Sequence, residues 1–269
     1  MSEASREHLG WIVRESGPED SDHTVLLLPG ALATAAFYDD LLAEPRISDS
    51  SIRFVATTLP GFGHTPAPQD VSMENYARLA GALATDLGCD AVVGHSLGAN
   101  IALEMAAGGE FSGPVVLISP SFSRGDESKF PRALDRLARV LGHLPYALML
   151  KIIGPAFKGS LPPHRRDALI AELRKNDPRF LRRQTHRYLE YLDRHGSLAP
   201  RLCNSRVRAS VVFGEHDDIG LTDEERGVLE ECPHITTVTI AEAGHFTLNE
   251  KPGQIADIVL DAVTSKTSR

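Results

Sequence analysis

The sequence predicts an α/β protein in which a mostly parallel sheet of about eight strands carries helices on both faces. Short runs of leucine and β-branched residues alternate with helical patterns along most of the chain. Most of these runs are too continuously apolar to leave one face in water, which is typical of central parallel strands. The alternation stops after residue 118 and returns near residue 209, and this gap predicts an inserted, largely helical segment.

Each expected element follows from its local pattern. The expected strands are 9–14, 24–28, 52–57, 91–94, 115–118, 209–213 and 236–240, and the helices between them are 33–43, 73–87, 97–107, 222–231 and 252–263. The inserted segment is expected to hold helices over 129–141, 145–153, 163–175 and 178–195, separated by prolines. We therefore expect a core of residues 1–120 and 206–269 and a helical cap, or lid, of residues 121–205.

Bulk composition indicates an ordinary folded protein and excludes several classes. The 269 residues are 42% hydrophobic and 24% charged, with a mean hydropathy of −0.14, which fits neither a disordered nor a membrane protein. No apolar run is long enough for a transmembrane segment, and the first residues do not read as a signal peptide. Three widely spaced cysteines favour free thiols in a reducing compartment, so a cytoplasmic location is expected.

Charge is distributed unevenly along the chain. The net charge of −8 argues against nucleic acid as a partner. Residues 121–205 contain seventeen Lys and Arg against eight Asp and Glu, a net charge of +9, which leaves −17 elsewhere. A basic lid can attract an anionic substrate, a carrier-bound acyl group or an acidic membrane surface, although arginines that only solvate exposed helices give the same pattern.

The first motif with chemical meaning is a Gly-x-Ser-x-Gly turn between an expected strand and an expected helix. Ser96 lies at its centre, with Gly94 and Gly98 on either side. A serine on such a sharp turn adopts strained dihedral angles, and side chains two positions away would collide with the neighbouring backbone. This context predicts that Ser96 is a nucleophile.

A serine nucleophile needs a base, and the base needs an acid that orients it. Downstream, one expected strand is followed by a turn that carries Asp217 and Asp218, and another is followed by His245. Both positions lie at the carboxyl ends of strands, where the serine turn also opens. The order serine, acid, histidine therefore predicts a catalytic triad, with the choice between the two aspartates open.

Four motifs in this order resemble the capped α/β-hydrolase superfamily. They are Leu-Pro-Gly-Ala at 28–31, Leu-Pro-Gly-Phe-Gly at 59–63, Gly-His-Ser-Leu-Gly at 94–98, and the pair Gly-Glu-His-Asp at 214–217 with Gly-His-Phe at 244–246. The resemblance implies the α/β-hydrolase fold and the triad Ser96, Asp217 and His245, with Asp218 as the second choice of acid. It also implies an oxyanion hole made by the backbone N–H groups of Ala31 and Leu97, with Leu32 as the alternative to Ala31.

Other candidates are weaker. The turn 215–218 is rich in metal-binding residue types, but neighbours on one turn seldom converge on an ion, so neither a metal nor a cofactor is expected. His95 is interpreted as a packing residue, and Leu32 and Phe246 are expected to line the substrate pocket. Six apolar lid residues are either pocket lining or packing: Leu144, Tyr146, Leu148, Met149, Ile152 and Phe157.

These observations favour a serine hydrolase that acts by acyl transfer on an ester, thioester or lactone of small size. A serine rather than an aspartate at the turn disfavours haloalkane dehalogenase and epoxide hydrolase chemistry. Carbon–carbon bond hydrolysis or lysis and cofactor-free perhydrolysis on the same triad are the alternatives. A non-catalytic small-ligand receptor on the same scaffold is the alternative from another class, and the oligomeric state is left open.

Overall fold

The computed structural model describes residues 6–156, 163 and 165–264, and within them the chain forms one eight-stranded sheet with the order β1-β2-β4-β3-β5-β6-β7-β8. The strands β3 to β8 run parallel, and β1 and β2 are antiparallel to their neighbours. The fold class is thus the predicted one. The strands are β1 (Arg6–His8), β2 (Trp11–Ser16), β3 (His23–Leu28), β4 (Ile52–Thr58), β5 (Ala91–His95), β6 (Val115–Ile118), β7 (Ala209–Gly214) and β8 (Ile235–Ile240).

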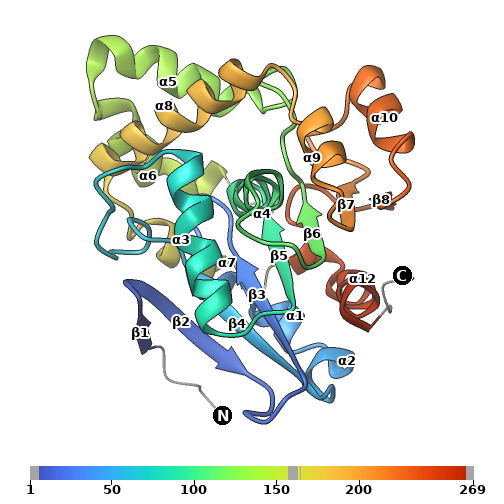
Figure 1. Ribbon diagram of the computed structural model, residues 1–269. Coiled ribbons are helices and arrows are strands. Elements are labelled where there is room, and N and C mark those ends of the chain that lie inside the picture. The colour runs from blue at the N-terminus through green and yellow to red at the C-terminus, as the bar shows by residue number, and fades with distance from the viewer. Residues whose placement is uncertain (1–5, 157–162, 164, 265–269) are drawn as a thin grey trace.

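Helices cover both faces of the sheet (Figure 1). One packed group consists of α3 (Met73–Asp86), α4 (Leu97–Gly108), α9 (Ala199–Ser205) and α10 (Asp223–Glu230). The other consists of the 3₁₀ helix η1 (Ala35–Tyr38), α1 (Asp39–Leu42), α2 (Pro45–Ser48), α11 (Thr247–Glu250) and α12 (Pro252–Thr264). The central strands β3, β5 and β6 are buried throughout or nearly so, because both of their faces are covered.

Most of the helical segment between β6 and β7 lies in the upper part of the view in Figure 1. Besides α9 it contains α5 (Lys129–Leu141), α6 (Leu144–Ala156), α7 (Arg166–Leu173) and α8 (Pro178–His195). Helices α5, α6 and α8 pack against one another. We call α5 to α8 the inserted helices.

Most expected elements are confirmed, and the differences are local. Strand β1 is not among the expected strands; this edge strand is polar and mostly exposed, so no apolar pattern marks it. The helix expected over 33–43 is instead the short η1 and α1, and α2, α9 and α11 were not expected. Thr222 and Glu225 form a capping box at the start of α10.

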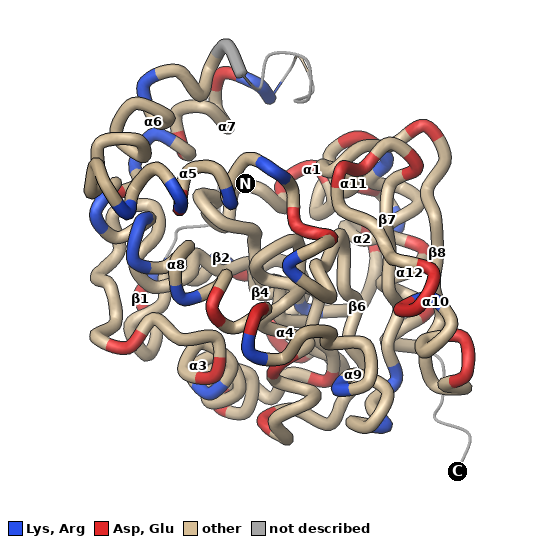
Figure 2. The backbone as a smooth tube through the Cα atoms, turned by 90° about the horizontal axis from the view of Figure 1, so that it is seen from above, with Lys and Arg blue, Asp and Glu red and all other residues tan. Residues whose placement is uncertain are grey.

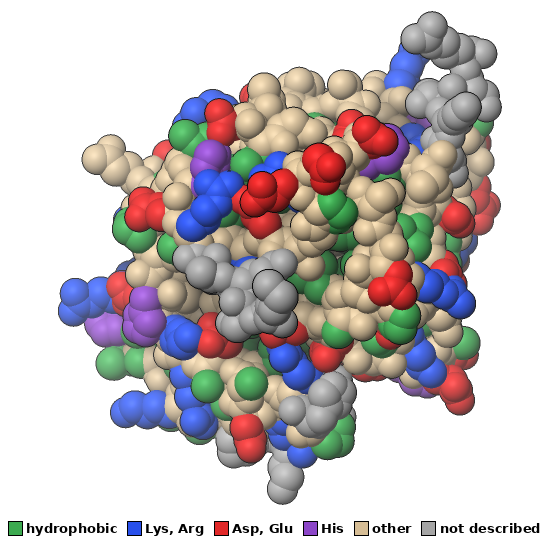
Figure 3. Space-filling view, turned by 90° about the horizontal axis from the view of Figure 1, so that it is seen from below, with side chains coloured by type: hydrophobic (Ala, Val, Ile, Leu, Met, Phe, Trp, Pro, Cys, Tyr) green, Lys and Arg blue, Asp and Glu red, His purple; other side chains and the backbone are tan. Residues whose placement is uncertain are grey.

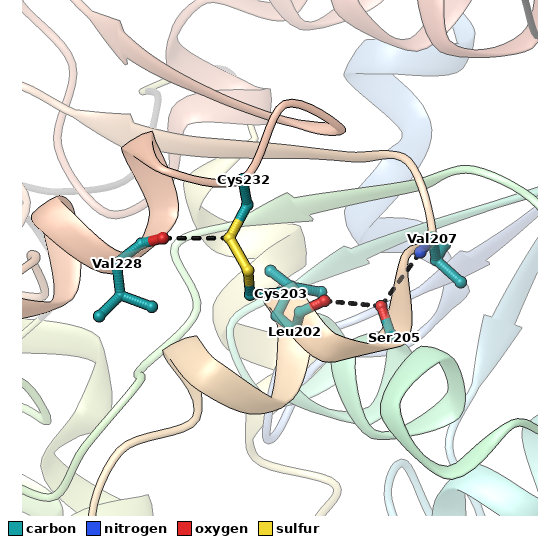
Figure 4. The surroundings of a disulfide bond; sticks show 6 residues. All are labelled: Leu202, Cys203, Ser205, Val207, Val228 and Cys232. Atoms are coloured by element: carbon teal, nitrogen blue, oxygen red, sulfur yellow. Dashed lines mark hydrogen bonds between the residues drawn. A yellow bond between two sulfur atoms is a disulfide. The ribbon is translucent and has the colours of Figure 1, made fainter.

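The expectation of three free cysteines is wrong. Cys203, in α9, forms a disulfide with Cys232, which follows α10, whereas Cys89 is free (Figure 4). The packing of α9 against α10 brings the two Cα atoms to 5.8 Å, within the normal range for a disulfide. The free-thiol argument for a reducing compartment therefore fails, and the cytoplasmic location stays a prediction without this support.

Candidate active site

Ser96 stands between β5 and α4 on a strained turn. Its φ of 50° and ψ of −117° are unfavourable for a side chain with a Cβ atom. A Cβ atom on Gly94 would lie 2.3 Å from the Gly98 carbonyl oxygen, and one on Gly98 would lie 2.1 Å from the Leu28 carbonyl oxygen. Both glycines are therefore required by close backbone approach, as the sequence predicts, and the turn presents Ser96 at the carboxyl edge of the sheet.

The structure joins His245 to Asp217. The distance between His245 Nδ1 and Asp217 Oδ1 is 3.0 Å, and the Asp217 side chain is fully buried whereas that of His245 is 29% exposed. Asp218 is exposed and forms no hydrogen bond with His245 among the described residues. Of the two aspartates left open by the sequence, the geometry thus brings Asp217 to the histidine.

Two further donors hold the Asp217 carboxylate. The Ser119 hydroxyl donates to Oδ2 at 2.5 Å, and the Ile219 backbone N–H donates to Oδ1 at 3.0 Å. Burial of the carboxyl acts to raise its pKa. The hydrogen bond and charge of His245, together with hydrogen bonds from Ser119 and Ile219, outweigh burial and leave the pKa of Asp217 below its usual value. Asp217 is therefore an ionised acceptor when it meets the imidazole.

This acceptor fixes the tautomer of His245. Because the ionised Asp217 Oδ1 accepts a hydrogen bond from Nδ1–H, the lone pair of the neutral ring is on Nε2. Ser96 and His245 line the same cavity, and no hydrogen bond joins the serine hydroxyl to the ring within the described residues. Such contacts in hydrolases often form only when substrate is bound.

The residues predicted for the oxyanion hole lie near Ser96. Leu97 is the first residue of α4, and Ala31 lies in the loop after β3 and lines the cavity. Neither backbone N–H donates to another group in the described part of the chain. Leu32, at a φ of 71°, also lines the cavity, as does Phe246, whose ring centroid is 5.5 Å from that of His245. All four residues are thus brought to the site.

His95 has a role that the sequence does not reveal. Its side chain is buried, its ring centroid is 4.9 Å from that of His245, and its Nε2 donates to the His245 carbonyl oxygen at 2.9 Å. Burial, with repulsion from His245, lowers the pKa of His95 to about 3. The ring is therefore neutral and packs as expected, and in addition it anchors the loop that carries His245.

A cavity of about 1080 Å³ opens over these residues. Its floor is formed by the core and its other walls by the inserted helices and the turn before them. The sequence left six apolar lid residues open between pocket lining and packing. Of these, Tyr146 and Met149 line the cavity, while Leu144, Leu148 and Ile152 are exposed. Phe157 lies outside the described residues.

No arginine lines the cavity among the residues that the structure describes. Arg165 instead bonds to the Ala36 carbonyl oxygen and to Asp39, which holds the start of α7 against the core. Arg132 and Arg166 are half-buried, and the other arginines of the inserted helices are exposed. The charged lining is mostly acidic and consists of Glu127, Glu172, Asp217, Asp218, Glu242, Glu250 and the single cation Lys251. This geometry gives no support to the hypothesis that the basic lid binds an anionic substrate through an arginine.

Ser119 and the Ile219 amide are the site groups that sequence reasoning missed. Ser119 directly follows β6 at a φ of 54°, which is unusual for a residue other than glycine. Its position at the carboxyl end of a buried strand, next to the strand that leads into Ser96, is the signal that the sequence offers.

Comparison with known proteins agrees with this fold. The model of the Alpha/beta hydrolase family matches residues 25–258. An esterase from Thermogutta terrifontis, with malate bound, is 18% identical at a TM-score of 0.71 and covers 93% of this chain and 92% of its own. The N-acyl homoserine lactonase AidH, complexed with N-butanoyl homoserine, is 20% identical at a TM-score of 0.73, with complete coverage of both chains (100% each).

A third solved structure is the thioesterase domain from the curacin biosynthetic pathway, 18% identical at a TM-score of 0.69, covering 97% of this chain and 99% of that one. No curated protein sequence matches the chain. At such low identities these likenesses concern the fold, and the chemistry has to be argued from the site.

Proposed function

Because this chain belongs to the alpha/beta hydrolase family, we propose that it is a serine hydrolase that cleaves a neutral carboxylic ester, thioester or lactone through an acyl-enzyme. The observation that carries this proposal is the pairing of His245 with the ionised Asp217 beside the cavity that also holds Ser96. An arrangement that fixes the lone pair of a histidine next to a strained serine is what nucleophilic acyl transfer needs.

In the proposed reaction, His245 Nε2 takes the proton of Ser96 as Oγ attacks the substrate carbonyl. The N–H groups of Ala31 and Leu97, which have no acceptor among the described residues, would stabilise the developing oxyanion, each by about 3 kcal/mol. Asp217 stabilises the imidazolium that forms. The leaving alcohol, thiol or ring oxygen receives the proton from His245, and water activated by the same nitrogen then releases the acid.

The cavity supports an uncharged acyl substrate. Its apolar walls include Phe130, Leu134, Met149 and Leu181, and its charged lining is acidic apart from Lys251. A carboxylate-bearing substrate, which carbon–carbon bond hydrolases of this fold would use here, would meet repulsion and no described arginine. This lining favours ester, thioester or lactone hydrolysis over that alternative. We propose on the same grounds that residues 121–205 are a cap over a core of residues 1–120 and 206–269.

The test combines active-site labelling with turnover. Wild type and Ser96→Ala are treated with a fluorophosphonate probe and assayed on p-nitrophenyl esters from acetate to decanoate, with Ser48→Ala, an exposed serine, as the matched control. We expect wild type and Ser48→Ala to label and turn over, and Ser96→Ala to do neither. A folded wild type that neither labels nor hydrolyses any ester contradicts the proposal and favours the ligand-receptor alternative.

Substrate charge is tested with a matched pair of esters, p-nitrophenyl butyrate and the p-nitrophenyl monoester of succinate, which differ mainly in a terminal carboxylate. The acidic lining predicts a kcat/KM at least tenfold lower for the succinate monoester. Equal or faster hydrolysis of the anionic ester would mean that a cation reaches the substrate and that the neutral-substrate proposal is wrong.

A further inference from the structure

The outer faces of α5 and α6 carry an unusual amount of exposed apolar surface. The apolar strip, as we call it, consists of Leu137, Val140, Leu141, Leu144, Leu148 and Ile152. Val140 is 85% exposed, and Leu144 and Leu148 are each 60% exposed. Large apolar side chains that gather on one surface mark contact with another apolar phase, unlike scattered single ones.

The strip is continuous because of helical spacing. Leu137, Val140 and Leu141 fall on one face of α5, and Leu144, Leu148 and Ile152 recur every four residues along α6. Helices α5 and α6 pack against each other. Their opposite faces are already used, since Ala138, Met149 and Ile153 are buried. The strip is therefore additional apolar surface that the fold itself does not need.

The strip is surrounded by positive charge. Residues 129–156 contain five cations, at positions 129, 132, 136, 139 and 151, against one acid, Asp135. Asp135 is buried and accepts from Arg139 and His186, so it adds no exposed negative charge. Figure 2 shows blue segments gathered over α5, α6 and α8, while red ones predominate near α10 and α11. On the face seen from below, the two signs are interspersed (Figure 3).

We propose that the apolar strip and its cations bind the surface of an anionic lipid layer. Apolar side chains that enter the headgroup boundary, flanked by Lys and Arg that meet lipid phosphates, are the arrangement found on helices that lie in that boundary. None of the described helices is long and apolar enough to cross a membrane, so the contact is peripheral.

Two other occupants fit the surface less well. A second copy of the chain, joined through a twofold axis, would set the five cations of one strip against those of the other with no exposed acid between them. A folded acidic protein would need a complementary shape for the convex outer faces of two helices, whereas a lipid layer adapts to them. Phe130, which is 54% exposed and also lines the cavity, falls on the same face of α5 as Leu137 and Leu141, so that the cavity lies next to the strip.

The test uses flotation with vesicles of phosphatidylcholine, alone or with 30% phosphatidylglycerol, and the inactive Ser96→Ala chain, so that hydrolysis plays no part. One variant, Val140→Asp/Leu144→Asp, changes the strip, and another, Arg136→Gln/Arg139→Gln, changes its charge. Leu9→Asp is the matched control, because Leu9 is also 60% exposed but lies outside the inserted helices. Circular dichroism melting shows that each variant is folded.

We expect binding to the anionic vesicles that weakens at least tenfold in each double variant and in 0.5 M salt, and that is unchanged in Leu9→Asp. Absence of binding at low salt overturns the proposal. So does equal binding to neutral vesicles, which would remove the charge argument. A dimer that sedimentation detects in the parent chain but not in Val140→Asp/Leu144→Asp, without vesicle binding, would assign the strip to a second copy instead.

Discussion

Asp217→Asn is expected to be milder than the loss of a triad acid usually is, because of how the carboxylate is held. The Ile219 N–H donates to Oδ1, the same oxygen that meets His245. If the new side-chain amide placed its NH₂ group at the position of Oδ1, two donors would face each other, because the Ile219 N–H can only donate. The opposite orientation places the NH₂ group next to the Ser119 hydroxyl, which can rotate and accept a hydrogen bond from it. The carbonyl oxygen therefore remains opposite His245 Nδ1, and the productive tautomer is kept.

The variant then loses only the charge of the acceptor. A hydrogen bond to a charged group contributes about 1.5–3 kcal/mol, so kcat/KM should fall about tenfold to 150-fold. Asp217→Ala, which removes control of the tautomer, should lose about 10⁴-fold. Asp218→Asn, which alters an exposed carboxylate of the cavity lining but not the contact with His245, serves as the matched control and should change kcat/KM for the neutral ester less than threefold, the order of ±0.5 kcal/mol typical of an exposed position.

The assay is kcat/KM for p-nitrophenyl butyrate at pH 8, with thermal melts to confirm folding. If Asp217→Asn is as damaging as Asp217→Ala, the argument from the Ile219 amide is refuted. If Asp218→Asn is the damaging substitution, the assignment of the acid itself is wrong.

Three further outcomes are expected. Gly98→Ala should lose about 3 kcal/mol of unfolding free energy in urea denaturation, since its Cβ atom would lie 2.1 Å from the Leu28 carbonyl oxygen. Cys203→Ser should lose ~3.5 kcal/mol in the same assay, because its disulfide closes a loop with a sequence separation of 29; an equally stable variant would show that the disulfide does not form in solution. Burial and Glu225 raise the pKa of Asp126 to about 6, so its contribution to stability, complete below about pH 4, should be lost as pH rises through 6, by about 2–3 kcal/mol. Asp126→Asn should flatten that part of the stability profile, and an unchanged profile would contradict the shift.

Much of the fold could be predicted from the sequence because buried parallel strands leave a strong pattern. The strands β3 to β7 are mostly apolar runs, and the sequence predicts their positions to within a residue or two. The turn at Ser96 is also predictable, because Gly94 and Gly98 are needed to avoid clashes with the neighbouring backbone. Such constraints are local, so a linear pattern is enough to reveal them.

The remainder depends on distances that a linear pattern does not contain. Edge strand β1 is held by pairing with β2, not by burial of its own side chains. The disulfide joins cysteines whose proximity follows only from how α9 packs on α10. The choice of Asp217 over Asp218 rests on a turn whose backbone directs one carboxylate to His245 and leaves the other exposed.

The basic composition of the inserted segment and the acidic lining of the cavity are compatible because they belong to different residues. Lys129, Arg136 and Arg139 of α5 are exposed, whereas Glu127, before α5, and Glu172, in α7, line the cavity. In the proposed reaction, hydrolysis of a neutral ester would create a carboxylate in that cavity, and the acidic lining would repel it. The lining thus opposes binding of the product more than binding of the substrate. A cavity lined by cations would instead bind the carboxylate product more strongly than the neutral ester. The position of the charges, more than their number, therefore decides which substrates the site favours.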